Sequence, residues 1–309
     1  MPQVKIFSGT ASRYLAEKIA TAYGQPLGDL TVSSFSDGEI GVHFNESIRG
    51  AEVFLVQSTF PPADNLMELM LMIDAAKRAS AHKVIVVMPY YGYARQDRKD
   101  KPRVSIGAKV VANAIQSVGA DRLMTCDLHA GQIQGFFDIP VDHLNGSAIF
   151  VPYLRSLNLG SDLIFASPDV GGVVRTRAFA TNFGAEMVVC DKHRKRANEI
   201  ASMQVIGDVE GMDVVLVDDM IDTAGTITKA AQLLKEKGAK TVRAIATHPV
   251  LSGPAYERIE NSVLEELVVS DTIRLRQECS KIKVLSFSQL FARAINSVVT
   301  HDSISSLFI

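Results

Sequence analysis

Residues 214–226, which read VVLVDDMIDTAGT, constrain the fold of this chain most strongly. The apolar residues 214–217 predict a buried strand of a parallel sheet. Two carboxylates, Asp218 and Asp219, follow at the expected end of that strand, and residues 227–237 have the pattern of a helix. A strand, a small polar loop and a helix, in this order, form the usual phosphate-binding arrangement of α/β proteins.

The loop at residues 222–226 carries the groups that an anion site needs. Its N–H groups and the start of the helix would face the anion, and Gly225 would let the backbone come close. Thr223 and Thr226 add hydroxyl donors. Asp218 and Asp219 would instead accept hydrogen bonds from sugar hydroxyls or hold a divalent cation. An ordinary strand-to-helix turn with a threonine cap is the alternative from this stretch alone.

Composition narrows the class of protein. A chain of 309 residues, 47% hydrophobic, is long enough for two domains with separate cores. The net charge of −2 gives no electrostatic reason for binding nucleic acid or an anionic membrane. The apolar run at 84–94 is shorter than the roughly 20 residues that span a bilayer, and no signal-peptide pattern is present. Three widely spaced cysteines fit a reducing cytoplasm and argue against structural zinc.

Polar segments follow predicted strands in the first half of the chain. Residues 35–39 (FSDGE) place an aromatic side chain and two acids around a glycine, and residues 95–99 (RQDRK) follow a strand at 83–88. His129 lies just past a strand at 122–126. Aromatic faces and cations suit a base and its phosphates. A tight turn, a solvated loop and a packing histidine are the respective structural alternatives.

The second half repeats this organisation. Asp169, followed by Gly171 and Gly172, comes after a strand at 162–166, and its neighbouring N–H groups would be free to face a pyrophosphate. Residues 192–196 (KHRKR) have no apolar anchor, which predicts a mobile, solvated loop. That loop would either close over a polyphosphate or be ordinary solvated surface. Likewise, residues 169–172 would be either a pyrophosphate site or a flexible connection between a strand and a helix.

A weak internal repeat links the two halves. Residues 50–58 (GAEVFLVQS) resemble residues 211–219 (GMDVVLVDD), with Gln57 and Ser58 in place of the acidic pair. The repeat predicts an α/β protein with two similar domains, at 1–145 and 146–309, each a mainly parallel sheet flanked by helices. Only the second would have the sugar-phosphate motif, and chance similarity between valine-rich strands is the alternative.

Together the motifs resemble those of class I ribose-phosphate pyrophosphokinases (PRPP synthetases), members of the phosphoribosyltransferase superfamily. The segments that match in order and spacing are 35–39, 95–99, 127–137, 167–172, 192–199 and 215–226. The resemblance covers essentially the whole chain. It implies two tandem type I phosphoribosyltransferase-like domains. The implied reaction moves the β,γ-pyrophosphoryl group of ATP to the 1-hydroxyl of ribose 5-phosphate, giving PRPP and AMP for nucleotide biosynthesis.

The resemblance also implies residue roles. Lys192 and Arg194 would be catalytic, and His129 and Asp169 would bind Mg²⁺. The pyrophosphate loop would be Asp169, Gly171 and Gly172. The ATP site would comprise Phe35, Asp37, Gly38, Glu39, Arg95, Gln96, Asp97 and Lys99. The ribose 5-phosphate site would comprise Arg194, Asp218, Asp219, Asp222, Thr223, Ala224, Gly225 and Thr226.

Assembly and regulation are implied by the same resemblance. In the family the segment at 35–39 serves a neighbouring subunit, which implies a homo-oligomer, typically a hexamer. Phosphate would activate the enzyme and ADP would inhibit it. A PRPP-consuming phosphoribosyltransferase and a non-catalytic regulatory subunit of the same fold are the competing interpretations. A P-loop kinase is disfavoured because no Gly-x-x-x-x-Gly-Lys-Ser/Thr motif occurs, and no Gly-x-Gly-x-x-Gly fingerprint is present.

Overall fold

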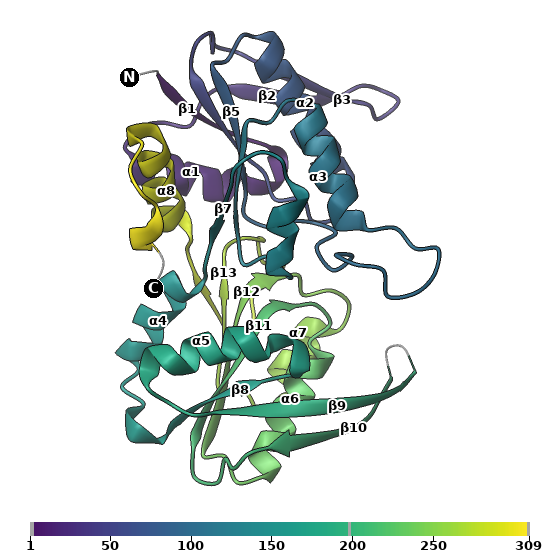
Figure 1. Ribbon diagram of the computed structural model, residues 1–309, viewed down its shortest axis with the longest axis vertical. Coiled ribbons are helices and arrows are strands. Elements are labelled where there is room, and N and C mark those ends of the chain that lie inside the picture. The colour runs from purple at the N-terminus through teal and green to yellow at the C-terminus, as the bar shows by residue number, and fades with distance from the viewer. Residues whose placement is uncertain (1–2, 197–198, 308–309) are drawn as a thin grey trace. The chain divides into compact units, whose positions relative to one another are not determined.

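A computed structural model describes the backbone at residues 3–196 and 199–307, and the side chains of these residues except 192–202 and 306 (Figure 1). The chain forms two compact units. The first unit runs to Asn145 and also takes Thr272–Arg274 and the stretch from Ser286 onward. The second unit comprises Gly146–Asp271 and Leu275–Leu285.

The first unit is built on a parallel sheet with the strand order β1-β4-β5-β6-β7. Its strands are β1 (Val4–Ser8), β4 (Glu52–Val56), β5 (Lys83–Met88), β6 (Arg122–Cys126) and β7 (Val141–Leu144). A separate antiparallel pair is formed by β2 (Leu30–Ser34) and β3 (Ile40–Phe44). All five residues of β4 are buried, as expected for a central strand with both faces covered.

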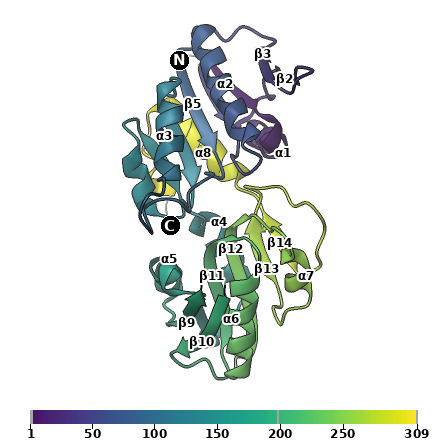
Figure 2. The same ribbon diagram turned by 90° about the vertical axis from the view of Figure 1, so that its right-hand side faces the viewer.

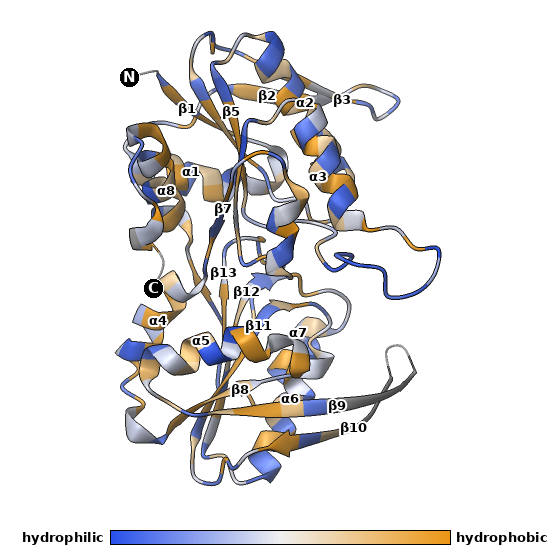
Figure 3. Cartoon of the chain, in the orientation of Figure 1, coloured by the Kyte–Doolittle hydropathy of each residue, from blue (hydrophilic) through white to orange (hydrophobic). Residues whose placement is uncertain are grey.

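Helices cover both faces of that sheet. On one face, α2 (Asp64–Arg78) and α3 (Gly107–Ser117) pack over the alternate residues Val53, Leu55, Val84 and Val86. On the other face, α8 (Ser288–Thr300) lies against α1 (Arg13–Tyr23), as Figures 1 and 2 show. The long connection between β5 and α3 contains a strongly hydrophilic stretch at residues 95–103 (Figure 3).

The second unit has the strand order β10-β9-β8-β11-β12-β13-β14, parallel except for the β9–β10 pair. Its strands are β8 (Leu163–Ser167), β9 (Met187–Arg196), β10 (Glu199–Ile206), β11 (Asp213–Ile221), β12 (Thr241–Pro249), β13 (Leu267–Ser270) and β14 (Ile282–Leu285). Val214 and Leu216 face α6 (Gly225–Glu236) and α7 (Ala255–Glu260). Val215 and Val217 face α4 (Ser147–Ser156) and α5 (Val173–Phe183).

The two units repeat the same order of elements. Strand, 3₁₀ turn, helix, antiparallel pair, strand, helix, strand, helix, two strands and a final helix occur from β1 to α4 and again from β8 to α8. The final helices are exchanged, because α4 belongs to the second unit and α8 to the first. The sequence-based division into 1–145 and 146–309 therefore differs from the structure, which returns the C-terminal helix to the first unit.

Two predicted segments differ in the structure. β11 extends through the acidic pair to Ile221 instead of ending at residue 217, because β12 pairs with it as far as Ile221 opposite Pro249. The basic segment at 192–196 was expected to be a loop, but β9 continues through it to Arg196. The reason is a non-local partner: β10 pairs antiparallel with β9 and supplies backbone hydrogen bonds that the charge pattern does not reveal.

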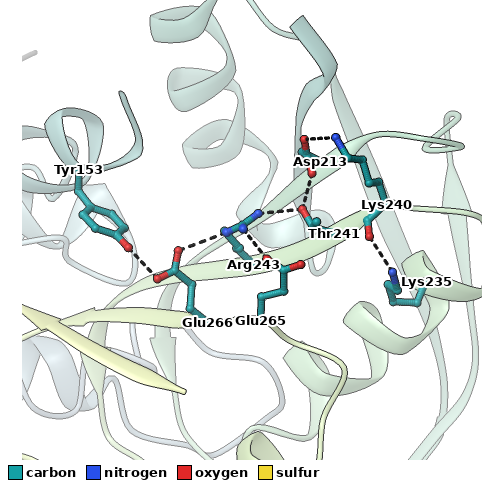
Figure 4. A network of polar contacts seen from close by, with 8 residues as sticks. All are labelled: Tyr153, Asp213, Lys235, Lys240, Thr241, Arg243, Glu265 and Glu266. Carbon is teal, nitrogen blue, oxygen red and sulfur yellow. Dashed lines mark hydrogen bonds and ion pairs between the residues drawn. The ribbon is translucent and has the colours of Figure 1, made fainter. Parts of the chain in front are cut away.

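A polar network ties together the amino ends of the central strands in the second unit (Figure 4). Arg243 on β12 lies 3.3 Å from the Glu266 carboxylate and pairs closely with Glu265. It also donates to Thr241, which in turn donates to Asp213 at the start of β11. The network lies at the opposite ends of the strands from the acidic pair. Among the described residues, no helix is long and apolar enough to cross a membrane.

Candidate functional site

The candidate site is built at the carboxyl end of β11. Pairing of β11 with β8 ends at Leu216 opposite Ala166, whereas pairing with β12 continues to Ile221. The acidic pair thus lies on a strand whose β8 edge is no longer laddered. Carboxyl ends of parallel strands are where α/β proteins place their ligands, and the acidic pair lies near this edge of the sheet.

The loop after β11 is held by the segment that follows β12. The Leu251 N–H donates to the Ile221 carbonyl at 2.9 Å, and the Ser252 N–H donates to the Asp222 carbonyl at 3.0 Å. The Ser252 hydroxyl also donates to the Asp222 carboxylate. Asp222 is therefore engaged in shaping the loop, a role that its position beside threonine and glycine did not indicate.

Helix α6 begins with an unusual backbone conformation. Ala224 has a φ of 59°, in the left-handed region that costs a non-glycine residue about 1–2 kcal/mol. Its carbonyl accepts from the Thr228 N–H at 3.1 Å and from the Thr228 hydroxyl at 2.8 Å. The first turn of a helix leaves N–H groups without intrahelical acceptors, which makes this end of α6 suited to an anion. Local strain is a common feature of ligand sites.

Asp218 and Asp219 form a crowded pair. The Asp219 side chain is almost fully buried, and its backbone N–H donates to the Asp218 carboxylate at 2.9 Å. Burial raises the pKa of Asp218 well above its usual range, and the neighbouring charges of Asp219 and Asp169 add to this. Arg175 acts in the opposite direction and lies 3.4 Å from the Asp219 carboxylate. A hydroxyl donor or a cation beside the two carboxylates would therefore reduce their mutual repulsion.

Arg175 was not identified from the sequence. It lies in the first turn of α5, where acidic residues are favoured and a cation is disfavoured by the helix dipole. A basic residue at that position needs an anionic partner, which was the available signal. The partner is Asp219 on β11, 44 positions further along the chain, so the pairing becomes evident only in the fold.

The segment after β8 is compact. The Asp169 carboxylate accepts from the Gly172 N–H at 3.2 Å, and the Ser167 hydroxyl donates to the Asp169 carbonyl at 2.6 Å. A Cβ at Gly172 would lie 2.8 Å from the Ser167 hydroxyl oxygen, so a larger residue would displace the Ser167 side chain from its bond to Asp169. A Cβ at Gly171 would lie 3.2 Å from the Asp169 carboxylate. The expectation that both N–H groups are free is wrong for Gly172, because Asp169 caps it.

In the first unit, residues 35–39 form the turn of the β2–β3 hairpin. The Phe35 N–H donates to the Glu39 carbonyl at 2.8 Å, and the Gly38 N–H donates to the Phe35 carbonyl at 2.9 Å. Asp37 accepts from the Glu39 N–H at 3.1 Å, and Gly38 has a φ of 96°. The Phe35 side chain is 63% exposed. The turn therefore presents an aromatic face to its surroundings.

The other first-unit candidates occupy loops after adjacent strands. Arg95, Gln96 and Lys99 are exposed in the connection after β5, and His129 is exposed after β6. The Gln132 side chain donates to the Asp97 carboxylate at 3.1 Å and so joins the two loops. Within residues 3–196 and 199–307, described His, Cys, Asp and Glu side chains form no group of three that could hold a metal ion.

Lys192 and Arg194 lie on β9, opposite Met203 and Ile200 of β10. Their side chains fall outside the described part of the structure. His129 belongs to the first unit, while Asp169, Arg175 and the residues of β11 belong to the second. Within the second unit the fold gathers Asp169, Arg175, Asp218 and Asp219.

A phosphate-type loop beside an acidic pair, at the end of a parallel sheet, defines an α/β protein of the phosphoribosyltransferase type. Comparisons with known proteins narrow this class. Residues 4–119 match the family model described as the N-terminal domain of ribose phosphate pyrophosphokinase. Residues 184–309 match the phosphoribosyl synthetase-associated domain.

Full-length relatives agree. A ribose-phosphate pyrophosphokinase from Porphyromonas gingivalis is 58% identical over 98% of this chain and 97% of its own length. One from Campylobacter jejuni is 55% identical over 99% of both chains. The crystal structure of phosphoribosylpyrophosphate synthetase from Mycobacterium smegmatis has a TM-score of 0.92 at 39% identity, covering 97% of this chain and 99% of that one. The chain belongs to the ribose-phosphate pyrophosphokinase family, which confirms the family and fold class predicted from the sequence.

Proposed function

We propose that this chain transfers the β,γ-pyrophosphoryl group of ATP to the 1-hydroxyl of ribose 5-phosphate, at the site built on β11 and α6. The products are PRPP and AMP, which serve nucleotide biosynthesis. Membership of the ribose-phosphate pyrophosphokinase family supports the reaction. The single observation that carries its location is the acidic pair directly before a strained loop at the start of a helix.

The sugar phosphate is bound in two parts. Residues 222–226 hold the 5-phosphate through the N–H groups at the start of α6 and the hydroxyls of Thr223 and Thr226. Asp218 and Asp219 accept hydrogen bonds from the ribose hydroxyls. The raised pKa of Asp218 supports this role, because a donor or a cation relieves the repulsion between the two carboxylates.

The nucleotide is bound by first-unit residues. Phe35 stacks on the adenine, and its exposed ring supports this role. The remaining ATP contacts are assigned to Asp37, Gly38, Glu39, Arg95, Gln96, Asp97 and Lys99. The β2–β3 turn serves the site of a neighbouring copy, so the enzyme works as a homo-oligomer, a hexamer by analogy with its family. An aromatic face exposed at a hairpin end supports such a contact.

Mg²⁺ bound to the nucleotide is held by Asp169 and His129, while Gly171 and Gly172 let the pyrophosphate approach the backbone. Both ligand side chains reach solvent, since Asp169 is half-buried and His129 is exposed. Mg²⁺ keeps several waters and phosphate oxygens, so two protein ligands fit its coordination. When bound, the ion neutralises charge on the transferring group.

Regulation and location are proposed from the same family resemblance. Phosphate is the proposed activator and ADP the proposed inhibitor. The cytoplasm is the proposed location, which the cysteine spacing supports.

Lys192 and Arg194 place positive charge on the transferring group. We expect Lys192→Ala to lower kcat on the order of 100–1,000-fold while the KM values change little, as for loss of one preorganised charge. Lys195→Ala removes the same charge from the same strand and should keep most of the activity. Similar losses in the two variants would show that general charge, and not Lys192 itself, matters.

The reaction is tested by AMP formation from ATP and Mg²⁺ with and without ribose 5-phosphate. AMP that forms only with the sugar phosphate, matched by equal PRPP, is the expected result. AMP formation without it would indicate a different transfer. No AMP, even with added phosphate, would favour a regulatory subunit that needs a partner chain.

A further inference from the structure

Arg258 on α7 contacts the loop that is proposed to hold the 5-phosphate. Its guanidinium Nη1 donates to the Thr223 carbonyl at 2.9 Å, across 35 positions of sequence. A Cβ at Gly225 would lie 3.1 Å from the same nitrogen, so the loop approaches the guanidinium closely at two residues. Arg258 lies outside every motif recognised in the sequence, so the sequence alone assigns it no role.

The bond completes a pattern along the loop. The carbonyls of residues 221 to 224 all accept hydrogen bonds from outside the loop. The donors to residues 221 and 222 are Leu251 and Ser252, and the donor to residue 224 is Thr228. Arg258 supplies the bond to residue 223, the one side chain in the set that comes from α7. In a trans peptide the carbonyl and the next N–H point in opposite directions. Holding Thr223 C=O toward α7 therefore holds the Ala224 N–H toward the opposite side.

The backbone conformation of Ala224 indicates which rearrangement this hydrogen bond opposes. A flip of the peptide between Thr223 and Ala224 would change the φ of Ala224 by about half a turn, from 59° to roughly −120°, while its ψ stays at 3°. That combination lies in the bridge region of negative φ, which L residues can adopt. An alanine gains energy from that flip, because its Cβ disfavours positive φ. The flip would break the bond to Arg258 and turn the Ala224 N–H away from its present direction. Arg258 thus opposes a relaxation that the sequence of the loop favours.

We propose that Arg258 is a positioning residue for ribose 5-phosphate, which keeps the Thr223–Ala224 peptide in its anion-binding orientation. This inference rests on the proposed role of residues 222–226. Arg258 acts through the loop and does not itself need to touch the substrate. Loss of its side chain should therefore weaken sugar-phosphate binding and leave the nucleotide unaffected.

The first test compares Arg258→Ala with a matched control. Lys229 on α6 lines the same groove of about 530 Å³ as Arg258, so Lys229→Ala removes a nearby positive charge. We expect Arg258→Ala to raise the KM for ribose 5-phosphate about 10-fold, with kcat and the KM for ATP nearly unchanged. Arg258→Lys should restore part of the affinity, because one ammonium can reach an acceptor without the guanidinium geometry. Equal effects of Arg258→Ala and Lys229→Ala would overturn the inference.

A double-mutant cycle tests the peptide orientation itself. Glycine has no penalty at positive φ, so Ala224→Gly removes the drive to flip. Arg258→Ala should then raise the KM much less in the Ala224→Gly background than in the wild type. The same fold-change in both backgrounds would contradict the proposal. Calorimetric binding of ribose 5-phosphate to all four proteins gives the same comparison without turnover. If the wild type forms no PRPP, the proposed reaction is refuted. The role of Arg258 is then still tested by the calorimetric affinities.

Discussion

Single residues at the site are held in arrangements that are energetically unfavourable for the protein alone. Asp218 is a half-buried acid beside the buried Asp219, and Ala224 has a positive φ. Each is compensated by a residue from another element, Arg175 in the first case and Arg258 in the second. Binding sites often store such strain, because a ligand that relieves it binds more tightly.

Replacing Asp218 should separate stability from activity. An acid whose pKa is higher in the folded chain than in the unfolded chain makes folding less favourable as the pH rises above the usual carboxyl pKa. Asp218→Asn cannot ionise, so without ligands it should melt above the wild type at pH 8, and the difference should shrink toward pH 4. A difference of about 1 kcal/mol in the free energy of unfolding would shift the melting temperature by roughly 2–4 °C.

The same variant should lose most PRPP formation, since an amide is a poorer acceptor for ribose hydroxyls than a carboxylate. Calorimetry of Asp218→Asn and of a control, Asp162→Asn, at both pH values checks the stability difference. Asp162 is exposed, so its replacement should have little effect at either pH. A lower melting temperature for Asp218→Asn at pH 8 would contradict the assigned direction of the pKa shift.

The sequence predicted the acidic pair and the loop at 222–226, because strand, loop and helix are adjacent in the chain. It did not predict Arg175, Ser252 or Arg258. Their partners lie 30 or more positions away, and each is an ordinary polar residue on its own element. Such compensating contacts depend on which strands become neighbours, which periodicity does not encode.

At the level of elements, strand pairing corrected the predictions more than helix formation did. The helix predicted at 227–237 differs from α6, at Gly225–Glu236, by only one or two residues at each end. β9 and β11 both run beyond their predicted ends, since β10 and β12 continue to pair with them. A strand depends on its neighbour, whereas a helix satisfies its backbone within its own segment.

The network around Arg243 should stabilise the second unit without affecting catalysis (Figure 4). Arg243 is mostly buried and contacts two carboxylates and the Thr241 hydroxyl. We expect Arg243→Ala to lower the free energy of unfolding by about 1–3 kcal/mol, because Glu266 loses a charged partner in a partly buried place. Activity at 25 °C should be retained, since the network is at the amino ends of the strands.

Urea unfolding of Arg243→Ala and Lys240→Ala tests this assignment. Lys240 also pairs with an acid of the network, at 3.4 Å from Asp213, but its side chain is 58% exposed. Its loss should cost about 0–1 kcal/mol, as for a surface ion pair. Equal costs would mean that the position of Arg243 between two carboxylates adds nothing beyond its charge.

At the scale of the whole molecule, the two units share one order of elements but differ in the residues at the carboxyl ends of their central strands. β11 carries an acidic pair near its carboxyl end and is followed by an anion-type loop, whereas Gln57 and Ser58 come directly after β4. The Gln57 amide donates to the buried Glu68 carboxylate, which also accepts from the Thr10 hydroxyl at 2.7 Å. A protein carboxylate thus occupies part of this region of the first unit, which disfavours binding of an anion there.

The exchange of α4 and α8 predicts which unit depends on the C-terminal helix. Phe291 on α8 is fully buried and packs against Phe287 with ring centroids 5.9 Å apart. Although α8 comes after β14 of the second unit in the chain, it packs on α1 of the first. We expect Phe291→Ala to destabilise the first unit by about 3–5 kcal/mol, the usual cost of removing a buried aromatic ring.

Hydrogen exchange followed by mass spectrometry localises this loss. In Phe291→Ala, amides of β1, α1 and β4 should exchange faster, while those of β11 and α6 keep their protection. Phe165→Ala is the matched control, because Phe165 is equally buried in the second unit, where it packs against Phe183 with centroids 5.3 Å apart. It should produce the opposite pattern. Faster exchange of β13 and β14 but not of α1 in Phe291→Ala would assign the last helix to the unit that precedes it in sequence. The packing of α8 on the first unit would then not stabilise that unit.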